Sequence, residues 1–138
     1  MAKNISIILS TYNESASIKN TINQLIHHIN DVEIIVVDDD SPDGTFEILK
    51  SIKYSKLKIF NRKKDKGLAS AFLLGLINAD GNIIGWVDSN MASVVEKFPE
   101  MISKLDNQDI VLLSRYVEGG EDLRNKARVI ASRLINFI

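Results

Sequence analysis

The sequence predicts an α/β fold: an open, mostly parallel sheet with helices on both faces. Short apolar runs rich in β-branched residues alternate along the chain with longer stretches of helical periodicity, as in doubly wound sheets. The run Ile34–Val37 is continuously apolar, which is typical of a central strand covered on both faces. With 138 residues, of which 45% are hydrophobic, the chain is long enough for the core of one domain.

The first half of the chain predicts two strand and helix pairs. Ile5–Leu9 is a short apolar run, and apolar residues then recur at helical spacing from Ile18 to Ile29. Val32–Val37 is the second strand and Thr45–Ile52 a short second helix.

The second half continues the alternation. We expect strands at Leu57–Asn61, Asn82–Val87 and Asp109–Leu113, a buried helix from Gly67 to about Ala79, a helix over Val94–Leu105 broken near Pro99, and a last helix from about Asn125 to the end. Gly75 inside the apolar helix costs about 1 kcal/mol relative to Ala unless close packing needs it.

Polar clusters follow three of the predicted strands. These clusters are Ser10–Glu14, Asp38–Asp40 and Asp88–Asn90. Because ligands of open α/β sheets bind at the carboxyl ends of the strands, the pattern predicts a site at that edge. Three adjacent acids repel one another unless a donor, a cation or water compensates them. The alternative for Asp38–Asp40 alone is a solvated turn punctuated by Pro42 and Gly44.

Two groups of basic residues suit an anionic ligand. Four basic side chains, Arg62, Lys63, Lys64 and Lys66, precede Gly67 and the start of a helix, where free amide groups add to their charge. Arg128 and Ser132 share a helix face with Asn136, and together they can hold a phosphate. For both groups a solvated basic surface is the alternative.

Composition excludes several classes of function. A formal net charge of -1 gives no electrostatic footprint for nucleic acid. The chain has no cysteine, so disulfides and thiolate zinc sites are excluded and a reducing cytoplasm is the natural compartment. No apolar run approaches the roughly 18 residues of a membrane span.

Five motifs in order give the chain a resemblance to the inverting family-2 glycosyltransferases of the GT-A fold, nearest the polyprenyl-phosphate or dolichyl-phosphate mannose synthase branch. Ser10–Glu14 resembles the opening motif of that family, and Val36–Thr45 its VVDDGSPDGT segment, with Asp40 in place of Gly. Arg62–Ala71 resembles R-x4-GLGTA, with Ala69 and Ser70 replacing Gly and Thr. Gly81–Asn90 resembles the strand before the metal-binding DxD, and Ser114–Gly120 resembles SRYxxGG.

The resemblance implies roles for particular residues. The nucleotide pocket would be lined by Thr11, Tyr12, Glu14 and Asp39, with Arg62 approaching the diphosphate; Asp88 would hold Mg²⁺ or Mn²⁺; and Arg115, Arg128 and Ser132 would bind the acceptor phosphate. The second metal carboxylate of the family aligns with Asn90, whose carbonyl oxygen a hard cation accepts but which removes one negative charge. We therefore expect a weakened or altered metal site.

The implied reaction is transfer of a mannose-type or glucose-type sugar from a GDP-sugar or UDP-sugar to a polyprenyl or dolichyl phosphate, with inversion. Members of the family continue well beyond the position that matches Ile138. We therefore expect residues 1–138 to be a GT-A domain incomplete at its C-terminus, which binds the donor without efficient transfer. The resemblance also implies peripheral contact with a membrane, at its cytoplasmic face.

Two other functions compete with this interpretation. A non-catalytic nucleotide-sugar binding module would share the pocket but not turn over. A receiver-like signalling domain also has adjacent acids, but these follow its first strand and are completed by an Asp after the third strand and a Lys after the fifth. Here Asn61 and Ser114–Arg115 stand at those places, so the receiver is a fold-level analogy only.

Overall fold

The computed structural model describes residues 3–114 of the chain. The chain divides into two compact units, residues 1–100 and 101–138. The sheet and the helices that cover it belong to the first unit. The helix predicted from Asn125 lies outside the described residues.

Strands and helices alternate as predicted. The elements are β1 Ile5–Thr11, α1 Ile18–His28, β2 Glu33–Asp38, α2 Thr45–Ser51, β3 Leu57–Asn61, α3 Leu68–Ile77, β4 Ile83–Trp86, the 3-10 helix η1 Ala92–Lys97 and α4 Phe98–Lys104. The predicted break near Pro99 is the change from 3-10 helix to α-helix at Phe98. Pro99 lies in the first turn of α4, where the backbone N–H that proline lacks would have no helical hydrogen-bond partner in any case.

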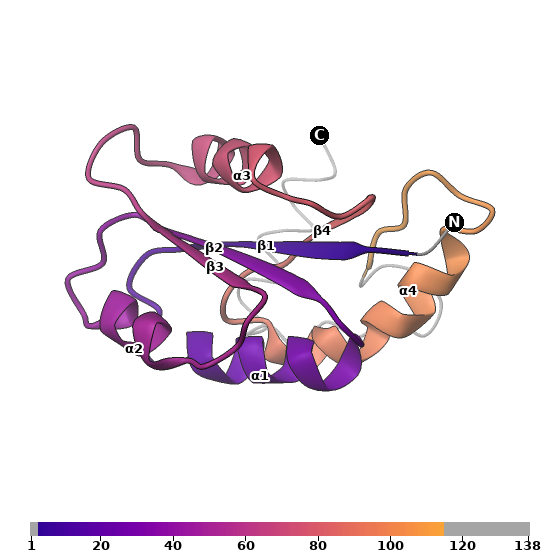
Figure 1. Ribbon diagram of the computed structural model, residues 1–138, viewed down its shortest axis with the longest axis horizontal. Helices are drawn as coiled ribbons and strands as arrows, with labels where there is room; N and C mark the ends of the chain where they lie inside the picture. Colours follow the sequence, from indigo (N-terminus) through magenta and orange to yellow (C-terminus); the bar gives the residue numbers. More distant parts are fainter. Residues whose placement is uncertain (1–2, 115–138) are drawn as a thin grey trace, which may run out of the picture. The chain divides into compact units, whose positions relative to one another are not determined.

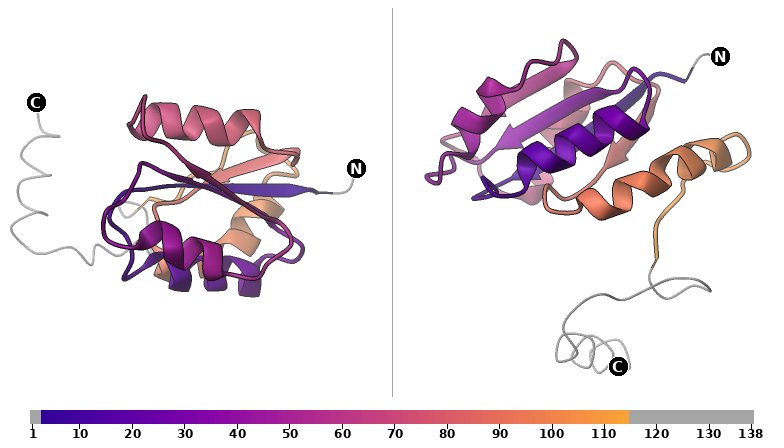
Figure 2. Two further views of the ribbon diagram at one scale, coloured as in Figure 1. Left: turned by 60° about the vertical axis from the view of Figure 1, so that its left-hand side comes forward. Right: turned by 90° about the horizontal axis from the view of Figure 1, so that it is seen from below.

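The four strands form one parallel sheet in the order β3-β2-β1-β4. In Figure 1, α3 lies on one face of this sheet, and α1 and α2 lie on the other. Figure 2 shows the same layers from two further directions. On the lower face α1 also packs against η1, while α3 packs on β1 and β2. The fold class predicted from the sequence is thus confirmed, with helices on both faces of an open parallel sheet.

The core lies around β2, as its continuous apolar run predicts. Every residue of Ile34–Val37 is fully buried. The stripe on α1 is buried at Ile18, Ile22 and Leu25 and continues to Ile29 just after the helix, so one face of this helix covers the sheet. Burial on both faces explains why β2 shows no alternation of polar and apolar residues.

Helix α3 differs from the prediction that it is buried. Only Ala71 and Gly75 are buried in it, whereas its large apolar residues Leu68, Leu73, Leu76 and Ile77 are exposed. A Cβ atom at Gly75 would lie 2.5 Å from Cγ2 of Ile8, so the missing side chain lets the helix lie close to β1. Because small residues make the close contact with the sheet, the four large residues named above are left exposed, while Phe72 is half-buried beside Trp86 of β4. Apolar composition alone was misleading.

The prediction of a fifth strand at Asp109–Leu113 was wrong. In the described part of the chain these residues form no strand, and the sheet has four. A strand exists only through its hydrogen bonds to a neighbouring strand, and a short apolar run does not specify that neighbour.

None of the helices within residues 3–114 has both the length and the apolar character needed to span a membrane.

Candidate active site

The carboxyl ends of β1, β2 and β3 lie level with one another. Thr11 pairs with Asp38, and Asp38 pairs with Asn61. Just beyond these pairs the Asp39 N–H donates to the Thr11 carbonyl at 3.0 Å, and the Arg62 N–H donates to the Asp38 carbonyl at 2.8 Å. The side chains that follow the three strands therefore meet at one edge of the sheet.

The turn after β4 reaches the same edge. The amide of Asn90 donates from Nδ2 to Glu14 Oε1 at 3.2 Å. Behind it, the buried Thr21 hydroxyl of α1 donates to the Ser89 carbonyl at 2.6 Å, which fixes the turn against the helix. Asp88 and Asn90 themselves are exposed. The structure thus brings together the ends of all four strands, as predicted for Thr11, Asp39 and Asp88.

Hydrogen bonds join the loop after β1 to the loop after β2. Backbone amides of the first loop donate to side chains of the second loop and of the first residue of α2. The pairs are Asn13 to Ser41 (2.9 Å), Glu14 to Thr45 (3.0 Å) and Ser15 to Asp43 (3.0 Å). Hydrogen bonds from Thr45 and from Ser15 hold the pKa of Asp43 far below its usual value. Asp43 is therefore ionised at neutral pH and organises both loops.

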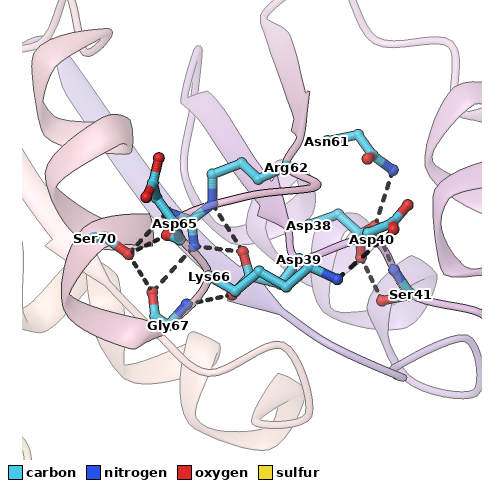
Figure 3. Close-up of polar contacts among 10 residues, drawn as sticks. All are labelled: Asp38, Asp39, Asp40, Ser41, Asn61, Arg62, Asp65, Lys66, Gly67 and Ser70. Carbon is cyan, nitrogen blue, oxygen red and sulfur yellow. Dashed lines mark hydrogen bonds and ion pairs between the residues drawn. The ribbon is translucent and has the colours of Figure 1, made fainter.

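The three adjacent acids have separate partners, which resolves their expected repulsion. Asp38 is fully buried and accepts the amide and hydroxyl of Ser41 and the Asn61 side chain (Figure 3). Asp39 binds Arg62, and exposed Asp40 lies 3.7 Å from Lys66. Asp38 is therefore a structural acid, and the alternative of a merely solvated turn does not hold for it or for Asp39.

Asp40 explains one departure from the family pattern. Its φ is 59°, in the left-handed region where glycine is the natural residue. Asp is among the few other residues that enter this region, because its short polar side chain bonds locally. Asp40 thus forms here the left-handed turn that a Gly would adopt without strain.

Arg62 and Asp39 form the most enclosed charged pair of the site, with side chains 10% and 13% exposed. Arg62 donates to Asp39 from both Nε and Nη2, and the Gly67 amide donates to the other carboxylate oxygen at 2.7 Å. Arg62 also donates to Ser70 and to two carbonyls of the following loop (Figure 3). Asp39 is thereby held in one orientation.

Unpartnered hydroxyls lie at the end of β1. The side-chain oxygens of Ser10 and Thr11 are buried and have no hydrogen-bond partner among the residues described. A buried polar group left unpaired costs about 1–3 kcal/mol, so these two hydroxyls are candidates for contact with a ligand. Next to them Tyr12 is 57% exposed, and its ring is available for stacking.

The residues after β4 fit a hard divalent cation in part. Asp88 offers a carboxylate oxygen and Asn90 a carbonyl oxygen, the donor types that Mg²⁺ and Mn²⁺ accept. No group of three or more His, Cys, Asp or Glu side chains that could hold a cation by itself occurs in residues 3–114. A cation held by Asp88 and Asn90 would therefore need further ligands from elsewhere.

Some residues that support the site were not predicted from the sequence, and some predicted ones lie outside the described residues. Ser41, Asp43, Thr45 and Asn61 support the site, and the Ser-x-Asp-x-Thr spacing at the start of α2 was the available signal. Arg115, Arg128 and Ser132, predicted to bind the acceptor phosphate, lie outside the described residues.

The sequence of this chain is similar to those of known proteins. The family model described as glycosyl transferase family 2 matches residues 6–137. A dolichol-phosphate mannosyltransferase of Pyrococcus furiosus is 36% identical over 122 residues, which are 85% of this chain and 34% of that protein. The enzyme of the same name from Saccharomyces cerevisiae is 28% identical over 142 residues, 96% of this chain and 53% of that protein.

A solved structure supports the fold. The mannosyltransferase PcManGT of Pyrobaculum calidifontis, determined with GDP-Man and Mn²⁺, has a TM-score of 0.58 and 24% identity, over 65% of this chain and 28% of that one. The chain spans about a third to about half of the length of the two curated relatives. The predicted GT-A fold is confirmed by these likenesses.

Proposed function

The chain belongs to glycosyl transferase family 2, and from that membership we propose that it carries the donor site of a hexosyltransferase. The enzyme would move a sugar from a nucleoside diphosphate to a polyprenyl or dolichyl phosphate, with inversion. The observation that carries the proposal is the meeting of Thr11, Asp39 and Asp88 at one sheet edge, where a buried hydroxyl has no described partner. The dolichol-phosphate mannosyltransferases among its relatives favour mannose and a lipid phosphate.

The nucleotide lies across the ends of β1 and β2 in this proposal. The Thr11 hydroxyl gains the partner it lacks, and the exposed ring of Tyr12 stacks on the base. Glu14 and Asp39 present carboxylate oxygens. Hydrogen bonds from Ser17 and Asn90 fix the orientation of Glu14, and hydrogen bonds from Arg62 fix that of Asp39. Fixed acceptors at a preformed site lose little entropy on binding.

Asp88 and Asn90 would hold Mg²⁺ or Mn²⁺ together with the phosphates of the donor. When bound, such a cation neutralises the negative charge that develops on the nucleoside diphosphate as it leaves. The two residues stand on a turn that Thr21 fixes to α1, so the donor atoms are positioned before the nucleotide arrives. Preorganisation of this kind is what the transition state requires.

The acceptor needs no general base. A phosphate monoester has a second pKa of about 6, so it is largely ionised at neutral pH. Its oxygen forms a bond to the anomeric carbon from the face opposite the leaving group, and the electrons of the broken bond leave with the nucleoside diphosphate. We assign the acceptor phosphate to Arg115, Arg128 and Ser132, and contact with a lipid surface follows from the nature of that acceptor.

Thermal unfolding with candidate donors tests the proposal. We expect the midpoint of residues 1–138 to rise with one of GDP-mannose, UDP-glucose or UDP-GlcNAc, and only when Mn²⁺ is present. A ligand at 100 times its dissociation constant stabilises the native state by about 2.7 kcal/mol. Mn²⁺ alone and mannose 1-phosphate are the controls. The absence of a shift with every donor would contradict the proposal.

A non-catalytic binding module is the second candidate, and Asn90 is the observation that favours it. Asn90 replaces a metal carboxylate, and its amide already donates to Glu14. Release of nucleoside diphosphate with polyprenyl phosphate as acceptor separates the two, measured on this chain and on one extended to the length of its relatives. We expect turnover by the extended chain; donor binding without turnover by either would establish the module.

A further inference from the structure

Arg62 has no hydrogen-bond donor left for a ligand. Its guanidinium donates from Nε and Nη2 to Asp39, from Nη1 to the Asp65 carbonyl and to Ser70 Oγ (both 2.9 Å), and from Nη2 to the Gly67 carbonyl at 3.1 Å. These bonds use every N–H of the guanidinium group. The role that the resemblance implies for Arg62, an approach to the diphosphate, would require it to give up some of them.

Leaving Asp39 would be unfavourable for Arg62. Both side chains are nearly buried. Separating a buried ion pair leaves each charge without a partner where little water can solvate it. Nε and Nη2 of Arg62 both donate to Oδ1 of Asp39, so moving the guanidinium group away from this one oxygen breaks both bonds. The energetics favour an Arg62 that remains with the protein when a nucleotide binds.

Ser70 completes a ring of bonds around the loop of residues 62–67. Its hydroxyl oxygen accepts from Arg62 and lies 2.7 Å from the Asp65 carbonyl and 3.0 Å from the Gly67 carbonyl, to either of which it donates. Gly67 has φ of 130°, a conformation suited to glycine, and its amide donates to Asp39. The loop is therefore fastened to α3 by Ser70 and to the end of β2 by Asp39.

We infer that Arg62 and Ser70 are positioning residues, which hold the Asp39 carboxylate and the loop 62–67 in the conformation that the nucleotide meets. The inference rests on the proposed function for the identity of the ligand, but the fastening itself does not. Ser70 stands where the family pattern has Thr, and a hydroxyl is common to both. The assignment therefore predicts that the hydroxyl matters and the extra methyl group does not.

Positioning and diphosphate binding predict different losses of affinity. A residue that binds the diphosphate contributes more to binding of a diphosphate than of a monophosphate, and a Lys in its place retains much of the charge interaction. A residue that positions Asp39 and the loop affects both nucleotides alike, and Lys cannot replace it because an ammonium lacks the planar fork. The ratio of the two dissociation constants distinguishes these roles.

The experiment measures GDP, GMP, UDP and UMP binding by calorimetry with Mn²⁺ present. Three test variants are used: Arg62→Lys, Arg62→Ala and Ser70→Ala. The two controls are Ser70→Thr and Lys56→Ala, which removes the same charge as Arg62→Ala but at a surface ion pair with Asp31. We expect the first three to weaken diphosphate and monophosphate binding equally, by about tenfold for loss of a charged hydrogen bond. Ser70→Thr and Lys56→Ala should match wild type. Loss confined to the diphosphates, or full affinity in Arg62→Lys, would overturn the assignment.

Limited proteolysis by trypsin tests the fastening without any nucleotide. Lys63, Lys64 and Lys66 are exposed in the loop, and the bonds described above hold its backbone. We expect cleavage after these lysines to be about tenfold faster in Ser70→Ala and the Arg62 variants than in Ser70→Thr. Equal cleavage would overturn the inference. If wild type binds none of the four nucleotides, the donor proposal fails while proteolysis still decides the fastening.

Discussion

The two edges of the sheet both carry charged clusters, but they differ in what those clusters leave unpaired. At the amino edge Glu33 accepts from Ser6, from the Asp80 amide at 2.9 Å and from Lys58 at 2.5 Å. Lys58 also binds Asp80 at 2.7 Å. Each charged group of this cluster thus has a bonded partner inside the protein.

The carboxyl edge is organised differently. Its buried acids are also paired, Asp38 with Ser41 and Asp39 with Arg62, but around them the hydroxyl of Thr11 is buried without a described partner and Asp88 is exposed. The comparison teaches that a charged cluster by itself does not mark a site. A site is indicated when a buried hydroxyl without a hydrogen-bond partner lies beside fixed charges. Of these two clusters, only the one at the carboxyl edge has such a hydroxyl among the described residues.

The largest expected effect comes from Asp88. Asp88→Asn removes the one carboxylate that we assign to the cation, so Mn²⁺-dependent affinity for the donor should fall by about a hundredfold or more, because loss of even a partner of a metal ligand costs about 10- to 100-fold. Calorimetry with the donor found in thermal unfolding measures it. Glu47→Gln, an equal change of charge on the exposed side of α2, is the control and should bind like wild type. Unchanged affinity in Asp88→Asn would show that Asp88 does not bind the cation.

The amino edge should respond in stability and not in binding. Burial raises the pKa of Glu33, but the hydrogen bonds from Lys58, Ser6 and the Asp80 amide outweigh it and the net pKa is lowered from 4.5. Glu33→Gln should lower the unfolding free energy by about 1–3 kcal/mol at pH 7 and leave donor affinity unchanged. Urea denaturation measures the first quantity and calorimetry the second.

The sign of the pH dependence follows from the lowered pKa. Because folding favours ionised Glu33, its contribution is complete above pH 4.5 and is lost as pH falls through the lower folded-state pKa. The difference in stability between wild type and Glu33→Gln should therefore shrink below pH 4.5. Hydrogen bonds to Asp80 and Glu33 raise the pKa of Lys58, so this partner stays charged throughout that range. A difference constant from pH 7 to pH 3 would refute the role of ionised Glu33.

Thr11 gives a sharper test of the contrast between paired and unpaired groups. Thr11→Val keeps the shape of the side chain and removes the unpartnered hydroxyl, so we expect stability to rise by up to about 1 kcal/mol while donor affinity falls about tenfold. Thr21→Val is the matched comparison, since that buried hydroxyl donates to Ser89, and it should be destabilised. Loss of stability in both would mean that Thr11 has a partner within the protein.

Asn90 should produce the smallest change. Asn90→Asp adds a carboxylate for the cation, and we expect a several-fold tighter Mn²⁺ affinity. The same substitution removes the bond to Glu14 and places two carboxylates together, so the thermal midpoint without metal should fall and recover on addition of Mn²⁺. Unchanged or weaker Mn²⁺ affinity would exclude Asn90 as a ligand.

Sequence patterns predicted most of the fold because the decisive elements are long or continuously apolar. The burial of Ile34–Val37 and the stripe on α1 followed directly from periodicity. The exposure of α3 and the absent strand at Asp109–Leu113 did not, because both depend on which neighbours an apolar segment meets. Local composition carries no information about that.

The candidate site was predictable in position but not in its bonds. Thr11, Asp39 and Asp88 each lie at or just past the end of an apolar run, and the parallel sheet brings those ends to one edge. That Arg62 is bound to Asp39 and Ser70 could not be foreseen, because basic residues next to a glycine and a helix suit a phosphate and a protein carboxylate equally. Only geometry decides between these acceptors.

Paramagnetic broadening by Mn²⁺ tests most directly the claim that the donor binds at the carboxyl edge. Amide NMR spectra of residues 1–138 with GDP or UDP are recorded with Mg²⁺ and then with Mn²⁺ added in small amounts. The account predicts that the signals of Thr11, Asp39 and Asn90 disappear first, while those of Ser6 and Lys58 at the amino edge persist. Earlier loss at Ser6 and Lys58, or uniform loss across the sheet, would contradict it.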